Sequence, residues 1–155
     1  MGWDNYHMFE FDLEGYRIGE LDENEDGYGS DQMLDSTAVK LGDIITQQKD
    51  NFNYLYDFGD GWKHQIKVEK FHNADANVNY PICIDGQMNC PPEDCGGIGS
   101  FYYCIEVQKD KKHPEYKEIA QWFSKKYDPT MFDKEKINRK LKGLDKYIRK
   151  WINGE

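Results

Sequence analysis

The sequence predicts an α+β domain in which helices pack on an antiparallel sheet. Three observations support this fold class. Polar and apolar residues alternate in the first half of the chain, as they do in strands half buried in a sheet. In the last third, apolar residues recur every three or four positions, which is typical of amphipathic helices. Aromatic residues make up 15% of the 155 residues, and their large side chains can fill the core of one domain spanning 1–155.

The first two strands are expected on either side of a turn at Glu14-Gly15. Residues 7–13 alternate, with His, Phe, Phe and Leu at the odd positions, so these side chains share one face. A returning strand follows through Tyr16 and Ile18. The acidic stretch 20–31 contains two glycines and is expected to be a loop. Residues 39–45 are expected to form a short strand or a helical turn.

The clearest local pattern is a hairpin over residues 51–71. Aromatic residues occupy every second position of 52–58, and Gly59-Asp60-Gly61 then interrupts the strand. In the segment 62–68, Trp, His, Ile and Val alternate with charged and polar residues. This pattern predicts two antiparallel strands joined by a tight turn, with the indole and the imidazole on the inner face.

Helices are expected after the segment 80–99, which is punctuated by proline and glycine and holds three cysteines. Ser100 can cap the first helix, and His113-Pro114 opens the second, because proline is tolerated at the first helical position. Asp128-Pro129 is a further start signal. The last helix is expected to carry one apolar stripe made of Ile137, Leu141, Leu144 and Ile148.

The charge of the chain is uneven. Residues 1–60 carry a net charge of −12 and residues 109–155 a net charge of +6, within a total of −9. The basic third can attract nucleic acid, although lysines on the solvated faces of helices explain this charge as well. The first residues do not resemble a signal peptide, and no run approaches the roughly 18 apolar residues of a membrane span. We therefore expect a cytoplasmic protein with no membrane partner, in which disulfides are rare.

Four motifs stand out along the chain. The first two are Gly2-Trp3-Asp4 with His7 and Phe9, and Tyr54-Leu55-Tyr56-Asp57-Phe58-Gly59-Asp60-Gly61-Trp62-Lys63-His64-Gln65-Ile66. The third is Cys90-Pro91-Pro92-Glu93-Asp94-Cys95-Gly96-Gly97, preceded by Tyr80-Pro81-Ile82-Cys83. The fourth comprises His113-Pro114-Glu115, Trp122, Tyr127-Asp128-Pro129 and Phe132-Asp133. Together they resemble the plasmid pRiA4b ORF-3-like family, over nearly the whole chain.

The resemblance implies no particular reaction. Members of this family occur on plasmids and near transposons, and some are labelled transposon passenger or resolvase-like (TnpR-like) proteins. It therefore implies an association with mobile elements, but no recombinase nucleophile pattern accompanies it here. Relatives usually have a strand and a helix before the Gly-Trp motif, which we expect to be missing from this chain. Cys104 stands where relatives have an apolar helical residue.

The cysteines suggest two alternatives. Cys83, Cys90 and Cys95 have the spacing C-x6-C-x4-C, and zinc prefers thiolate and imidazole ligands. His64 is the fourth ligand of this hypothesis, and His7 and Cys104 are alternatives for that position. Because the short-spaced pair C-x2-C is missing, the sequence favours the alternative that these residues are buried thiols and core histidines.

A second set combines carboxylates with a histidine: Asp57, Asp60, His64, Glu93 and Asp94. Such groups can bind Mg²⁺ or Mn²⁺ and activate water, as in nucleases. The alternative is turn chemistry, because aspartates beside glycine bond to nearby backbone N–H groups. A third match, residues 22–27, resembles part of a calcium-binding loop, but Met33 stands where a bidentate glutamate is needed, so a solvated acidic loop is expected.

Two functions follow. The first is a non-enzymatic binding or interaction module with a protein or nucleic-acid partner, using a groove beside the Gly59–Gly61 turn and the Cys90–Gly97 loop. The second is a metal-dependent hydrolase or nuclease that uses the carboxylates and His64. Convergence of several of these groups on one pocket favours the enzyme. Carboxylates that each bond to a backbone amide favour the module. In both cases, the hairpin Asn51–Phe71 is expected to pack against the loop Cys83–Gly97.

Overall fold

The computed structural model describes residues 2–13, 15–20, 33–48, 50–123 and 127–152. The chain divides into two compact units. The first, here called the sheet unit, contains residues 4–72 and 94–102. The second, here called the helical unit, contains residues 1–3, 73–93 and 103–155. Strands precede most of the helices along the chain, so the α+β fold class is confirmed.

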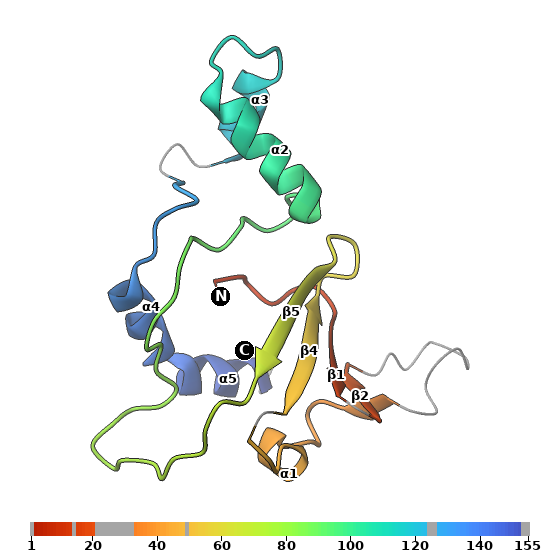
Figure 1. Ribbon diagram of the computed structural model, residues 1–155, viewed down its shortest axis with the longest axis vertical. Coiled ribbons are helices and arrows are strands. Elements are labelled where there is room, and N and C mark those ends of the chain that lie inside the picture. Colours follow the sequence, from red (N-terminus) through yellow and green to blue (C-terminus); the bar gives the residue numbers. More distant parts are fainter. Residues whose placement is uncertain (1, 14, 21–32, 49, 124–126, 153–155) are drawn as a thin grey trace. The chain divides into compact units, whose positions relative to one another are not determined.

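The sheet unit is built on a five-stranded sheet (Figure 1). Its strands are β1 (Phe9–Leu13), β2 (Tyr16–Gly19), β3 (Met33–Asp35), β4 (Asn51–Tyr56) and β5 (Trp62–Lys67). Their spatial order is β3-β2-β1-β4-β5. Neighbouring strands are antiparallel except β2 and β3, which are parallel. The predicted antiparallel sheet is therefore correct, with one parallel pair at its edge.

The core lies on one face of this sheet, where alternation places the apolar side chains. A cluster of buried residues joins Leu13, Ile18 and Phe52 to Ile45, which follows the short helix α1 (Leu41–Ile44). This helix lies beside the end of the sheet at which β4 begins (Figure 1). The same face carries a row of rings, including Phe11 and Tyr54 with centroids 4.7 Å apart and Tyr54 and His64 with centroids 5.5 Å apart.

The hairpin is as predicted except at its turn. Trp62 is opposite Tyr56 in the β4–β5 ladder and is only 8% exposed. However, β4 ends at Tyr56 rather than at Phe58, which is 48% exposed. The reason is that Asp57 has a left-handed backbone, with φ of 56°. A strand cannot continue through that conformation, so the alternation in the sequence no longer corresponds to alternation of faces.

The remaining helices are α2 (Gly97–Lys109), α3 (Tyr116–Trp122), α4 (Lys134–Leu141) and α5 (Leu144–Ile152). Helix α2 begins in the sheet unit and ends in the helical unit. In the helical unit, the Asn138 side chain on α4 accepts the Cys83 N–H at 2.7 Å and donates to the Cys83 carbonyl at 2.9 Å. No helix in the described part of the chain combines the length and the apolarity needed to cross a bilayer.

Four predicted helix boundaries are wrong, and one of them is the start of α3, which begins at Tyr116 and not at Pro114. Helix α2 starts at Gly97, before Ser100. Helix α4 starts at Lys134, where the Asp133 carboxylate accepts the Lys136 N–H at 2.8 Å, and Asp128 instead closes a local turn with Thr130. The expected last helix is two helices, because the chain turns at Lys142-Gly143 and the Gly143 N–H bonds to the Lys140 carbonyl at 3.0 Å.

Candidate functional site

Sheet register brings His7 and Asp57 together. Phe9 in β1 lies opposite Tyr56 in β4, so the residues just before β1 and just after β4 meet at the same end of an antiparallel pair. The Asp57 N–H extends the ladder by donating to the Met8 carbonyl at 2.9 Å. At this end, the imidazole Nε2 of His7 lies 3.6 Å from the Asp57 carboxylate Oδ2.

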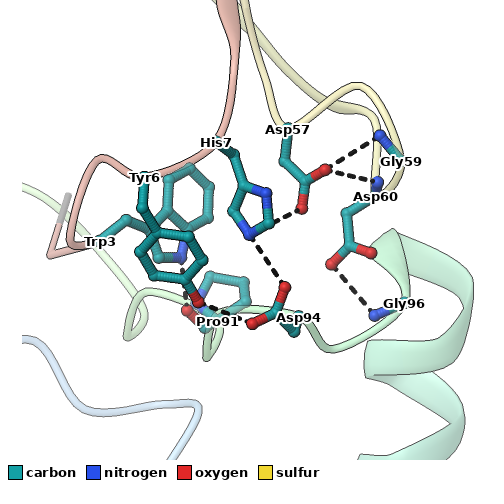
Figure 2. Close-up of polar contacts among 9 residues, drawn as sticks. All are labelled: Trp3, Tyr6, His7, Asp57, Gly59, Asp60, Pro91, Asp94 and Gly96. Atoms are coloured by element: carbon teal, nitrogen blue, oxygen red, sulfur yellow. Dashed lines mark hydrogen bonds and ion pairs between the residues drawn. The ribbon is translucent and has the colours of Figure 1, made fainter.

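The Asp57 carboxylate has two separate tasks. Its Oδ1 accepts the N–H groups of Gly59 at 2.9 Å and of Asp60 at 3.2 Å. The Gly61 N–H also donates to the Asp57 carbonyl at 2.6 Å, which closes the turn. Aspartate tolerates the left-handed conformation because its short side chain makes such local bonds. With Oδ1 used by the turn, Oδ2 is directed toward His7 (Figure 2).

Asp94 completes the cluster from the loop that precedes α2. Its Oδ1 lies 2.9 Å from His7 Nε2, and its Oδ2 accepts the hydroxyl of Tyr6 at 2.6 Å (Figure 2). Like Asp57, Asp94 has a left-handed backbone, with φ of 54°. Two residues further on, the Gly96 N–H donates to the Asp60 Oδ2 at 3.0 Å. The loop that carries Asp94 is thus attached to the turn that carries Asp57.

The cluster is graded from buried to exposed. The side chains are 9% exposed for Asp57, 26% for His7 and 57% for Asp94. The hydrogen bond from Tyr6 is the main factor that lowers the pKa of the Asp94 carboxyl below its ordinary value, and His7 lowers it further. Asp94 is therefore ionised at neutral pH, and its carboxylate presents negative charge at the open side of the imidazole.

Three atoms of this cluster can act as ligands of one metal ion. His7, Asp57 and Asp94 each offer one ligand atom, and all three atoms lie within 4.8 Å of one another. Bonds of about 2.0–2.2 Å separate neighbouring ligand atoms by roughly 3 Å. The distances of 2.9 Å and 3.6 Å from His7 Nε2 to the two carboxylates are close to this value. Imidazole with carboxylates suits divalent ions such as Mn²⁺, Fe²⁺ and Zn²⁺.

The structure treats the predicted carboxylate set unevenly. It brings Asp57 and Asp94 together, whereas Asp60 bonds to the Gly96 amide. His64 does not belong to this cluster of the sheet unit; its Nδ1 lies 3.2 Å from the Tyr54 carbonyl oxygen. His7 takes its place. Glu93 belongs to the helical unit.

The cysteine hypothesis stays a prediction. Cys83 and Cys90 belong to the helical unit, and Cys95 and His64 to the sheet unit. Cys95 is fully buried, and Cys83 and Cys90 are half-buried. Burial is the main factor that raises the pKa of the Cys90 thiol, although the Gly2 backbone N–H opposes it. Cys104 lies on α2 and is buried. The calcium-loop match at 22–27 lies outside the described residues.

Two parts of the site were missed by sequence reasoning. The sequence predicts no role for Tyr6 and indicates His7 only as an alternative zinc ligand. The sequence indicates both residues only weakly, because their place in the site depends on the pairing of β1 with β4 and not only with β2. That pairing joins segments more than 40 residues apart, and alternation within each strand does not reveal it.

The protein thus combines an α+β fold with a histidine–carboxylate cluster at one end of its sheet. The sequence matches the family described as plasmid pRiA4b ORF-3-like protein over residues 1–136, and the chain belongs to this family. It is 33% identical over 153 residues to the uncharacterized protein y4hQ of Sinorhizobium fredii, covering 97% of this chain and 75% of that protein.

A solved structure is also similar. It is a protein of unknown function, MM3350, from Methanosarcina mazei Go1, and its crystal structure matches with a TM-score of 0.76 at 31% sequence identity. The match covers 86% of this chain and 74% of that protein. The fold of this chain is therefore similar to that of a solved structure, and the descriptions of these two similar proteins assign no reaction.

Proposed function

We propose that this protein binds a divalent metal ion through His7, Asp57 and Asp94 and acts as a metal-dependent hydrolase. One observation carries the proposal: an imidazole nitrogen and two carboxylate oxygens, from three distant parts of the chain, lie within 4.8 Å of one another. Three protein ligands leave coordination positions for water and substrate, which is the arrangement of catalytic rather than structural sites.

Each ligand has a distinct part in this function. Asp57 is buried and held in place by the turn, so it is the inner and fixed ligand of the site. Asp94 is exposed, and the Tyr6 hydroxyl orients its carboxylate. If these residues hold a Zn²⁺ ion, the ion would lower the pKa of a bound water to about 7. Hydrolysis would then add the hydroxide of that water to an acyl or phosphoryl centre and its proton to the leaving group.

The binding module remains the second candidate, and one observation favours it. Both Asp57 Oδ1 and Asp60 Oδ2 accept backbone N–H groups, which is the pattern expected of carboxylates that shape turns. In that case the contact between His7 and Asp94 is a hydrogen bond that holds the loop in place. The exposed rings of Tyr6 and Phe58, 58% and 48% exposed, then offer a surface to a protein or nucleic-acid partner. The link to mobile elements is part of this second proposal.

Hydrolysis assays on metal-free protein separate the two candidates. Mn²⁺, Zn²⁺ and Mg²⁺ are added back singly, with bis(p-nitrophenyl) phosphate and p-nitrophenyl acetate as probes. We expect turnover with at least one ion, lost in His7→Ala and kept in His72→Gln, which removes a histidine that is exposed and distant in sequence. Metal binding without turnover on either probe would contradict the hydrolase and favour the module.

A further inference from the structure

The structure assigns Asp60 a positioning role: its carboxylate fixes the loop that carries Asp94, so that the ligand set is held together before a metal ion arrives. This inference rests on the proposed function, since it concerns the same site. Sequence reasoning placed Asp60 among the carboxylates that would contact a metal ion. In the structure it bonds to a backbone amide of the neighbouring loop.

A chain of contacts leads from one ligand to the other through Asp60. The Asp57 carboxylate accepts the Asp60 N–H at 3.2 Å, which fixes the backbone of Asp60 relative to the first ligand. The Asp60 Oδ2 then accepts the Gly96 N–H at 3.0 Å, only two residues after Asp94. Figure 2 shows this path beside the His7–Asp94 contact. Without the bond between Asp60 and Gly96, Asp94 would be positioned mainly by the contacts of its side chain with Tyr6 and His7.

Backbone packing supports the same attachment. Gly97 has φ of +73°, and a Cβ at this position would overlap the Asp60 carbonyl oxygen. The start of α2 therefore lies directly against the Asp60 backbone. The ring of Phe101, one turn along α2, contacts Trp62 edge-on with centroids 6.3 Å apart. The carboxylate of Asp60 also lies near the N-terminus of α2, where negative charge is favoured.

Two other groups of polar residues in the described part of the chain give weaker grounds for a site. Tyr103 donates to Glu115 at 3.0 Å beside His113, but all three are surface residues or half-buried and form one local contact. Among the described basic side chains of α4 and α5, Arg139, Lys140 and Arg149 are exposed. Neither has a feature that identifies a ligand, whereas Asp60 is bonded into the path between two of the proposed ligands.

The test compares Asp60→Asn with Asp60→Ala in calorimetric titrations with Mn²⁺. Asparagine keeps an oxygen that can accept the Gly96 N–H, and alanine does not. Positioning residues of metal sites affect affinity by about 10–100-fold. We expect such a loss for Asp60→Ala, nearly native affinity for Asp60→Asn, and one ion per chain in both. Asp35→Ala is the matched control, since Asp35 also accepts a backbone N–H, from Thr37, elsewhere in the sheet unit.

Amide hydrogen exchange at Gly96 provides a second measurement that needs no metal. The Gly96 N–H should exchange faster in Asp60→Ala than in the native protein or in Asp60→Asn. Equal loss of affinity in both variants would overturn the positioning role and make Asp60 a ligand. Unchanged exchange in Asp60→Ala would also overturn it. If the native protein binds no metal but exchange responds as expected, the proposed function fails while the attachment by Asp60 stands.

Discussion

His7 Nε2 lies 2.9 Å from Asp94 Oδ1, although 87 residues separate the two along the chain. The contact joins the segment before β1 to the loop before α2. Asp57 approaches the same nitrogen from the turn after β4. A protonated His7 would form an ion pair with the carboxylates, and a neutral His7 would leave Nε2 for a metal ion. His7 Nε2 thus faces two carboxylates, and the proposed metal site depends on this arrangement.

The loss of thermal stability at acidic pH should depend partly on Asp94. Hydrogen bonds from Tyr6 and His7 lower its folded-state pKa below 3.8. A depressed carboxyl pKa stabilises the fold above the unfolded value, and this contribution is lost as the pH falls through the folded value. The melting temperature of the native protein should therefore fall more steeply than that of Asp94→Asn below about pH 4. The difference in melting temperature should be small because Asp94 is exposed. If the two proteins show parallel curves of melting temperature against pH, this prediction is contradicted.

The loss of thermal stability at alkaline pH should depend partly on Cys90. Burial raises the pKa of its thiol above 9.0, so the folded protein keeps this proton to higher pH than the unfolded chain. The contribution to stability is complete below the unfolded pKa and is lost as the pH rises through the folded pKa. Melts above about pH 9 should show a decline that Cys90→Ala reduces. If Cys90 were a metal-bound thiolate, a chelator would lower the melting temperature near neutral pH and Cys90→Ser would do the same.

Replacing Trp62 should destabilise the sheet unit strongly. Trp62 is 8% exposed and contacts Phe101 edge-on, so Trp62→Ala should cost about 3–5 kcal/mol in the free energy of unfolding. Chemical denaturation measures this difference. Trp122, which is 50% exposed, provides the control, and its replacement by alanine should cost less than about 1 kcal/mol. Equal effects of the two substitutions would show that the inner-face assignment is mistaken.

Two glycines of α2 should respond in opposite directions to alanine. Gly97 has a left-handed backbone and lies against Asp60, so Gly97→Ala should lower the free energy of unfolding by at least about 1–2 kcal/mol. Gly99 has nothing within 4 Å of an added Cβ, and Gly99→Ala should raise it by about 0.5–1 kcal/mol, because alanine favours helix. A stable Gly97→Ala variant would mean that α2 does not start against the turn at Asp60.

The fold was largely predictable because its signals are local. Alternation in 62–68 identified β5 and the inner position of Trp62, and alternation in 7–13 identified β1. The predicted boundaries are wrong where the apolar pattern of the sequence continues past the point at which the strand or helix ends. Phe58 continues the alternation of β4, but the left-handed Asp57 ends the strand. In the same way, the stripe from Ile137 to Ile148 crosses a chain turn at Gly143.

The candidate site was only partly predictable because its geometry is not local. Asp57 and Asp94 were selected by residue type and by motif. Their actual partner, His7, depends on the register between β1 and β4 and on a loop 87 residues away. His64 has the right chemistry in the sequence, but in the sheet its ring lies over Tyr54 and its Nδ1 faces a carbonyl oxygen. Residue type alone does not distinguish these two histidines.

Calorimetric titration of metal-free protein with Mn²⁺ and with Zn²⁺ tests the central claim most directly. We expect one ion per chain. His7→Ala and Asp94→Asn should lower the affinity at least about tenfold, which is the lower end of the effect of outer-shell partners alone, whereas His64→Gln, Cys83→Ser and Cys90→Ser should leave it unchanged. Absence of binding would contradict the account. So would binding that the cysteine substitutions abolish and the His7 substitution leaves intact, since the ion would then be held by thiolates.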